Sequence, residues 1–392
     1  MGMSFLLLSI LLYLSRFNVR TLKFWKFELA SHKRIFGLDF LRAFAIFSVL
    51  LSHSSFLLNE QWQKWIGWFV FDGVSMFFVL SGFLIGGILI KTLEKHGSSV
   101  PVLLNFWSRR WIRTLPNYFL ILGVLLIAAW VYGFPIGISE SLRFATFTQN
   151  LNSPHPLFYP EAWSLSVEEW FYLLSPIFAF GLSKIMRVQK AMLVTVLSVI
   201  AGVTYFRYMK HLNLELTSFE MWDVNFRKQV LTRLDAIMYG VFGAYLKFYH
   251  NSRWNWNPMA CLIAGIFIMC GVRLMSIFGY HQLGLYLNVF VFSVGSIGTL
   301  LLFPFLDKWK DANFSGSEFV TKISLISYSL YLVNLTIVQH IVLNQIEFLQ
   351  ASPWYKFFLF WLLTYTIACI MYKHFEVPAM NLREKFNFSR KL

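Results

Sequence analysis

The most constraining feature of this chain is a series of ten apolar stretches of about 20 residues each. A helix of that length crosses roughly 30 Å of hydrocarbon and satisfies its own backbone hydrogen bonds there. Apolar residues make up 57% of the chain and charged residues only 14%, which is more apolar surface than a soluble core can bury. The sequence therefore predicts an all-α polytopic membrane protein with no soluble domain. The predicted spans are 36–58, 66–90, 114–134, 163–183, 191–206, 230–249, 258–277, 285–305, 320–343 and 356–376.

The net charge of +15 is explained by topology rather than by nucleic acid, which is not an expected partner. The connections on one side of the predicted spans hold 24 Lys or Arg residues, and the alternate connections hold 8. The positive-inside rule places the side with more basic residues in the cytoplasm. The N-terminal flank and the C-terminus are therefore predicted to be cytoplasmic, with membrane lipid around the spans.

The chain is predicted to form one membrane domain over 36–381. Residues 1–35 form an apolar, interfacial segment followed by a basic cytoplasmic flank, and 382–392 form a basic cytoplasmic tail. An eleventh span within residues 1–14 remains an alternative. The three cysteines match no metal-ligand spacing, so no metal is expected.

The first span carries ionisable residues, which are costly in hydrocarbon and indicate function. Asp39, Arg42 and His53 all lie in it. Eleven residues of helix turn about 1100°, so Arg42 and His53 share one face about 16 Å apart. Arg42 is then a cation on the cytoplasmic side, where it guides a donor or pairs with Asp39, and His53 is an imidazole near the outer side.

Depth along the helices predicts further ionisable residues level with His53, in the outer third of the membrane: Asp72, Glu168, Glu169, Arg233 and Asp235. Such a cluster suits proton transfer, because a carboxylate can fix the tautomer of a histidine that acts as a base. Glu168 and Glu169 point about 100° apart, so one is expected to face His53 and the other to pair with Arg233. Asp72 and Asp235 are expected to be structural partners. The alternative is that His53 is a satisfied polar residue between packed helices.

Three arginines open the third span, at Arg109, Arg110 and Arg113. Arg110 and Arg113 are three residues apart and therefore share a helix face. Guanidinium groups suit phosphate, which predicts a binding site for a phosphorylated donor. The alternative is an anchor to anionic lipid headgroups.

Several motifs together resemble the membrane-bound acyltransferase family 3, bacterial proteins that acylate surface carbohydrates, peptidoglycan or secondary metabolites. They are GLDFLRAFAIFSVLLSH (37–53), GVSMFFVLSGFLI (73–85), SRRWIRTLPNYF (108–119), WSLSVEEWFYLLSP (163–176), ISYSLYLVN (326–334) and HFEVPAMN (374–381). Ser75 stands where an acidic residue is often found. Asn334 stands where histidine is often found, which weakens the case for proton handling by the late span.

The resemblance implies an O-acetyltransferase of the bacterial inner membrane that takes acetyl from cytoplasmic acetyl-coenzyme A. The expected acceptor is a hydroxyl of an extracytoplasmic carbohydrate such as the O-antigen of lipopolysaccharide. His53 is then the general base or a transient acyl carrier, with Glu168 and Glu169 as further catalytic residues. Ser166, Tyr331 and Asn334 lie in the matched motifs and are assigned supporting roles. Peptidoglycan, a small metabolite or a lipid-linked sugar as acceptor remain alternatives, as do a proton-coupled transporter and a scaffold protein.

Overall fold

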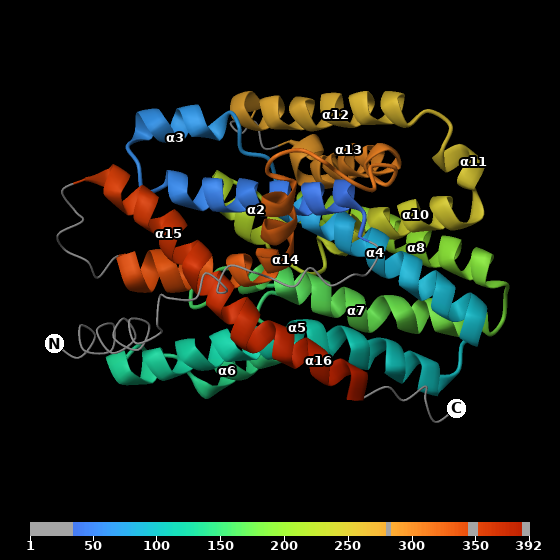
Figure 1. The fold of residues 1–392 in the computed structure, drawn as a ribbon, viewed down its shortest axis with the longest axis horizontal. Coiled ribbons are helices and arrows are strands. Elements are labelled where there is room, and N and C mark those ends of the chain that lie inside the picture. Colours follow the sequence, from blue (N-terminus) through green and yellow to red (C-terminus); the bar gives the residue numbers. More distant parts are fainter. Residues whose placement is uncertain (1–33, 280–283, 344–351, 386–392) are drawn as a thin grey trace. The chain divides into compact units, whose positions relative to one another are not determined.

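The computed structural model describes residues 34–279, 284–343 and 352–385 (Figure 1). The chain divides into two compact units, 1–34 and 35–392, and the architecture below is that of the second. The expectations for residues 1–33, including an eleventh span, lie outside the described residues, as does most of the predicted C-terminal tail. The described residues form helices and connections without a strand, which confirms the all-α prediction.

Each predicted span coincides with a long helix. These helices are α2 (Phe36–Ser55), α4 (Gly73–His96), α5 (Val100–Tyr132), α7 (Ala162–Ser183), α8 (Val188–Asn213), α10 (Leu234–Tyr249), α12 (Pro258–Gly279), α13 (Val291–Leu306), α14 (Ser317–Val333) and α15 (Pro353–Met371). Eight are long and apolar enough to cross a membrane, counting α13, α14 and α15 with their π-helical and helical extensions. The other two are α7, which carries Glu168 and Glu169, and α10, which has only 16 residues.

Shorter elements connect or extend these helices. The short α-helices are α3 (Glu60–Gly67), α6 (Ile138–Ala145), α9 (Phe219–Trp222), α11 (Asn251–Trp254) and α16 (Val377–Lys385). Among the residues that the structure describes, four segments are π-helical: η2 (Asp223–Arg227), η3 (Tyr286–Phe290), η4 (Asn334–Val342) and η7 (Tyr372–Glu376). In η4 and η7 the wider turn continues α14 and α15 directly, so backbone N–H groups change partners there.

The second span begins later than predicted. The sequence placed its start at 66, which put Asp72 about two turns inside the helix. In the structure α3 ends at Gly67, and α4 begins at Gly73 with Asp72 as its N-cap, accepting a hydrogen bond from the backbone N–H of Ser75 (3.2 Å). Asp72 is therefore a capping residue at a helix end.

The helices α4 and α10 pack especially closely against each other. A Cβ added at Gly82 would lie 1.8 Å from the carbonyl oxygen of Ile237, and one at Gly240 would lie 2.0 Å from that of Val79. Only glycine permits this approach of two backbones, as is common between membrane helices. The pair forms one wall of the cavity described below.

The two ends of the bundle are occupied by different short elements (Figure 1). One end carries α3, α6 and the start of α15, and we call it the α3 end. The opposite end carries α11 and the end of α4, and we call it the α11 end. The basic connections 91–113 and 247–257 follow α4 and α10 and therefore lie at the α11 end.

Candidate active site

A cavity of about 800 Å³ lies between α2, α4, α5, α7, α10 and α14. Asn251 of α11 and Lys91 near the end of α4 line its mouth at the α11 end. Val74 and Ser164 line its deep part, because they lie in the first turns of α4 and α7, which both run toward the α11 end. Cavities of this size accommodate ligands as large as a cofactor.

The half of this cavity nearest the α11 end is strongly basic. Five cationic side chains line it: Arg42, Lys91, Arg110, Arg113 and Lys247. Asp39 lies 3.8 Å from Arg42, and Asp307 accepts a hydrogen bond from Lys247 (2.7 Å). The lining side chains themselves include only one carboxylate, Glu168. The field of this region therefore favours an anionic ligand.

The structure separates the three arginines that were expected to bind the donor, and the expectation for Arg109 is wrong. Arg110 and Arg113 both line the cavity, whereas Arg109 does not line it and is exposed. Arg42, from the first span, lines the same cavity. The structure thus brings together two groups of cations that are about 70 residues apart in the sequence.

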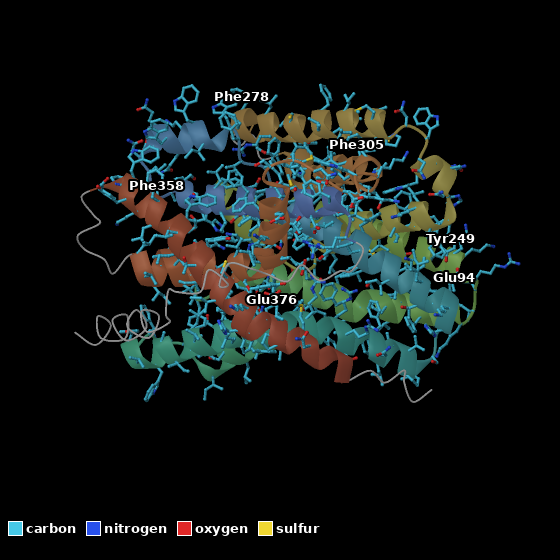
Figure 2. All side chains as sticks on the ribbon, viewed as in Figure 1. Glu94, Tyr249, Phe278, Phe305, Phe358 and Glu376 are labelled. Atoms are coloured by element: carbon cyan, nitrogen blue, oxygen red, sulfur yellow. The ribbon has the colours of Figure 1, made fainter. Side chains whose placement is uncertain are left out.

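A hydrogen bond links α4 and α10 near the mouth of the cavity. The hydroxyl of Tyr249 donates a hydrogen bond to Oε1 of Glu94, and Figure 2 shows both side chains at the α11 end. Next to them, Lys247 bonds to Asp307 at the end of α13. These contacts connect the ends of α4, α10 and α13 around the basic entrance.

Hydroxyl groups and a carboxylate line the deep part of the cavity. Glu168 accepts hydrogen bonds from Ser81 (3.0 Å) and Tyr172 (3.2 Å). Tyr331 of α14 and Ser164 of α7 are hydrogen-bonded to each other through their hydroxyl groups (2.7 Å). The hydroxyl groups of this polar end can donate hydrogen bonds to the reacting carbonyl of a bound donor.

His53 does not line the cavity itself and is connected to its deep end through Asn334. Its Nδ1 lies 2.5 Å from the side-chain oxygen of Asn334. The amide nitrogen of Asn334 donates to the carbonyl oxygens of Leu330 (3.2 Å) and Tyr331 (2.6 Å). Asn334 therefore offers His53 an acceptor, which fixes the proton on Nδ1 and leaves the lone pair of Nε2 available as a base.

This contact corrects two expectations from the sequence. The group that fixes the imidazole was expected to be Glu168 or Glu169, but the described residues give His53 no carboxylate partner. Glu168 bonds to Ser81 and Tyr172, and Glu169 accepts from Thr114 (2.7 Å). The late span, whose part in proton handling was in doubt from the sequence, supplies the residue that orients His53.

The other ionisable residues of the expected cluster form separate groups. Arg233 donates to Ser75 (2.5 Å) rather than to a glutamate, and its guanidinium lies 4.1 Å from the ring centroid of Phe292. Asp72, besides capping α4, lies 4.0 Å from Arg227. The hydroxyl of Ser75 links these two residues, since it accepts from Arg233 and donates to Asp72 (2.6 Å), and the described residues show no cluster of these charges around His53.

Asp235 has a partner that the sequence did not reveal. Arg207 was assigned to a connection beyond the fifth span, but α8 continues to Asn213, and Arg207 is fully buried in it. Its guanidinium makes a bidentate contact with Asp235, with distances of 2.9 and 2.7 Å. Asp235 is therefore a structural partner, as expected, but of an arginine that only the longer helix brings within reach.

The remaining predicted residues occupy supporting positions. Ser166 is buried outside the cavity lining, where it accepts a hydrogen bond from Gln149 (2.6 Å). Asp39 accepts one from Ser324 (2.8 Å) and so joins α2 to α14. Tyr331 lines the cavity directly.

Glu376 is a buried carboxylate that no prediction singled out, although it lies in the last matched motif. It belongs to η7 and accepts hydrogen bonds from Asn117 of α5 (3.0 Å) and Ser329 of α14 (2.6 Å) (Figure 2). Tyr328, beside Ser329, donates to the carbonyl of Thr114 (2.8 Å) and lines the cavity. Glu376 thus braces the wall that α5 and α14 form.

The geometry of a basic cavity that ends beside an oriented histidine suits group transfer from an anionic donor, and the sequence comparisons agree. Residues 35–373 match the model of a family described as an acyltransferase domain. The chain belongs to this acyltransferase family. The match includes every residue that lines the cavity, together with His53 and Asn334, whereas Glu376 lies just beyond it.

Three relatives in this acyltransferase family show what the chain is similar to. A putative peptidoglycan O-acetyltransferase, YrhL of Bacillus subtilis, is 34% identical over 188 residues, which are 43% of this chain and 27% of the relative. The peptidoglycan O-acetyltransferase OatA of Listeria monocytogenes is 33% identical over 181 residues, 42% of this chain and 27% of the relative. The O-acetyltransferase OatA of Staphylococcus aureus is 35% identical over 157 residues, 36% of this chain and 24% of the relative. The matched stretch thus spans about a quarter of each relative's length. No solved structure matches the chain.

Proposed function

We propose that this protein is an O-acetyltransferase of the bacterial inner membrane. It would move an acetyl group from cytoplasmic acetyl-coenzyme A to a hydroxyl of a cell-envelope carbohydrate. The observation that carries the proposal is the cavity, which joins five cationic side chains at the α11 end to Tyr331 at its deep end, from where Asn334 connects Tyr331 to His53. Family membership supports the reaction class.

The donor enters from the α11 end. The positive-inside rule places this end in the cytoplasm, because the connections rich in Lys and Arg lie there. Arg110 and Arg113 are suited to the phosphates of coenzyme A through bidentate contacts, and Lys91 and Lys247 add positive charge at the mouth. The acyl thioester would then reach the hydroxyl-lined deep end.

The names of the relatives favour peptidoglycan as the acceptor. The O-antigen of lipopolysaccharide, first expected from the sequence, is the second choice. Both are extracytoplasmic glycans with free hydroxyl groups, so the same chemistry serves either.

His53 is the general base of the reaction. Its Nε2 takes the proton of the acceptor hydroxyl as the hydroxyl oxygen attacks the thioester carbonyl. The carbon–sulfur bond breaks, the sulfur leaves as thiolate and receives the proton from the imidazole, and the products are an acetyl ester and free coenzyme A. A transient acetyl group on His53 is the alternative route, with the same products.

The test uses purified protein with isotope-labelled acetyl-coenzyme A and peptidoglycan or O-antigen fragments. Wild type is expected to form acetyl esters detectable by mass spectrometry. His53→Ala should lose about 10²–10⁴-fold in transfer while it keeps donor affinity and thermal stability. A stable His53→Ala protein with near-normal transfer would refute the role of His53. Wild type that binds the donor but forms no acetyl ester would refute the reaction.

A further inference from the structure

A buried glutamate, Glu161, caps the place where α14 changes its winding. α14 ends at Val333 and continues as the π-helix η4, which frees backbone N–H groups at the junction. Oε1 of Glu161 accepts hydrogen bonds from the N–H groups of Leu335 (3.1 Å) and Thr336 (2.6 Å). Oε2 accepts another from the hydroxyl of Thr336.

Its own helix does not explain this side chain. Glu161 is the residue before α7, but its side chain makes no capping hydrogen bond to α7. It is only 2% exposed, and burying a carboxylate is costly unless it is fully hydrogen-bonded. Its carboxylate accepts three hydrogen bonds from η4, about 175 residues further along the chain. The side chain therefore acts on the other helix.

The contacts of Glu161 lie on both sides of Asn334. Its backbone carbonyl accepts a hydrogen bond from the hydroxyl of Tyr331 (3.1 Å), three residues before Asn334. Its carboxylate holds Leu335 and Thr336, directly after Asn334. Asn334 is the residue whose oxygen lies on Nδ1 of His53. The backbone that carries this carboxamide is thus fixed from both directions by one residue.

We propose that Glu161 is a positioning residue for His53. By holding the α14–η4 junction, it keeps the Asn334 oxygen on Nδ1 and so keeps Nε2 free as the base. This inference rests on the proposed function, because it assigns Glu161 to the same reaction. Glu161 does not touch the reacting atoms and acts through Asn334.

The first experiment measures acetyl transfer at varied donor concentration. Glu161→Ala should lower kcat by up to about 100-fold, since a displacement of about 1 Å in a catalytic group can cost that much. The KM for acetyl-coenzyme A should stay unchanged, because Glu161 does not line the donor cavity. Glu161→Gln keeps an oxygen for the two N–H groups and should retain activity within about tenfold of wild type. Glu60→Ala, an exposed glutamate at the α3 end, is the matched control and should behave as wild type.

The second experiment separates positioning from general support of the fold. If Glu161 acts through Asn334, the double variant Glu161→Ala/Asn334→Ala should have the same kcat as Asn334→Ala alone. Losses that multiply would overturn the proposal, as would a stable Glu161→Ala protein with the kcat of wild type. Should Glu161→Ala not fold, Thr336→Val removes one of the hydrogen bonds alone, and an unchanged kcat in that variant would also overturn it.

Failure of the proposed function has a different result. Wild type that forms no acetyl ester, or His53→Ala that forms it normally, removes the reaction or its base. Wild type that depends on His53 but tolerates the loss of Glu161 leaves the reaction in place and removes only the role of Glu161.

Discussion

Asn334 uses both amide hydrogens on backbone carbonyls of its own helix, so only its oxygen remains for His53. This division of roles explains how a neutral residue can replace the carboxylate that orients histidine in many hydrolytic sites. The carboxamide fixes the tautomer without adding a charge inside the membrane. An asparagine is therefore a low-cost partner for a base at this depth.

The arginines of α5 give a residue-scale prediction about the donor. Replacing Arg110 and Arg113 together with glutamine should weaken acetyl-coenzyme A binding by at least about tenfold, since each charge-assisted hydrogen bond contributes roughly 1.5–3 kcal/mol. Arg109→Gln is the control and should bind normally, because Arg109 faces away from the cavity. Calorimetry on the detergent-solubilised variants provides the measurement. Equal affinity in all three proteins would make these arginines headgroup anchors.

Glu161 also gives a prediction about pH. Burial raises the pKa of its carboxyl from the ordinary 4.5 to about 7, so the folded protein keeps this proton at a pH where the unfolded chain has released it. The retained proton contributes roughly 3 kcal/mol to the free energy of unfolding. This contribution is complete below pH 4.5 and is lost as the pH rises to 7. Burial holds the pKa of the neighbouring Tyr159 well above its ordinary value, so that group stays protonated over this range.

Glu161→Gln has no such titration. As the pH rises from 5 to 8, the thermal midpoint of Glu161→Gln should therefore rise by several degrees relative to that of wild type. Melting curves of both proteins in one detergent at the two pH values give the comparison. A constant difference between the proteins would show that Glu161 does not titrate in this range.

At the scale of elements, the close contact of α4 and α10 sets the shape of the cavity wall. Gly240→Ala places a methyl group 2.0 Å from the carbonyl oxygen of Val79, so the two backbones must move apart. We expect a loss of about 1–3 kcal/mol in stability, visible as a lower thermal midpoint. Gly202→Ala in α8 is the matched control, because its added Cβ meets nothing within 4 Å. That variant should be neutral or slightly stabilised, and an equal loss in both would mean that helix contact is not the cause.

The break between α14 and η4 is the second feature at this scale. An uninterrupted α-helix would satisfy the N–H groups of Leu335 and Thr336 within the helix, and they would not need Glu161. The wider turn instead exposes them to α7. π-helical segments often occur at functional sites, and here one lies directly beside the candidate base.

At the scale of the whole molecule, the predicted orientation can be tested by cysteine labelling. In a background with Cys261, Cys270 and Cys369 replaced by alanine, Glu60→Cys at the α3 end should react with a membrane-impermeant maleimide from outside the inner membrane. Ser252→Cys at the α11 end should react only after lysis. Both positions are exposed, so access to the reagent depends on the side of the membrane. The reverse pattern would place the basic cavity mouth outside and refute a cytoplasmic donor.

The class, the approximate positions of ten long helices and the residues of one helix that share a face could be predicted from the sequence. Span length and composition are local properties, and the 3.6-residue period relates Arg110 to Arg113 without reference to other helices. The motifs likewise identified the family, which the match over residues 35–373 confirms.

Which polar groups meet depends on the tertiary structure. Depth along a span excluded some pairs but did not choose among those left, so Glu168, Glu169 and Arg233 were assigned to the wrong partners. The contacts that orient His53 join residues 281 and 175 positions apart in the chain, through Asn334 and Glu161. They depend on how each helix is rotated against its neighbours and on one change of winding after Val333. Rotation and winding follow from side-chain packing between helices, which no single segment of the sequence contains.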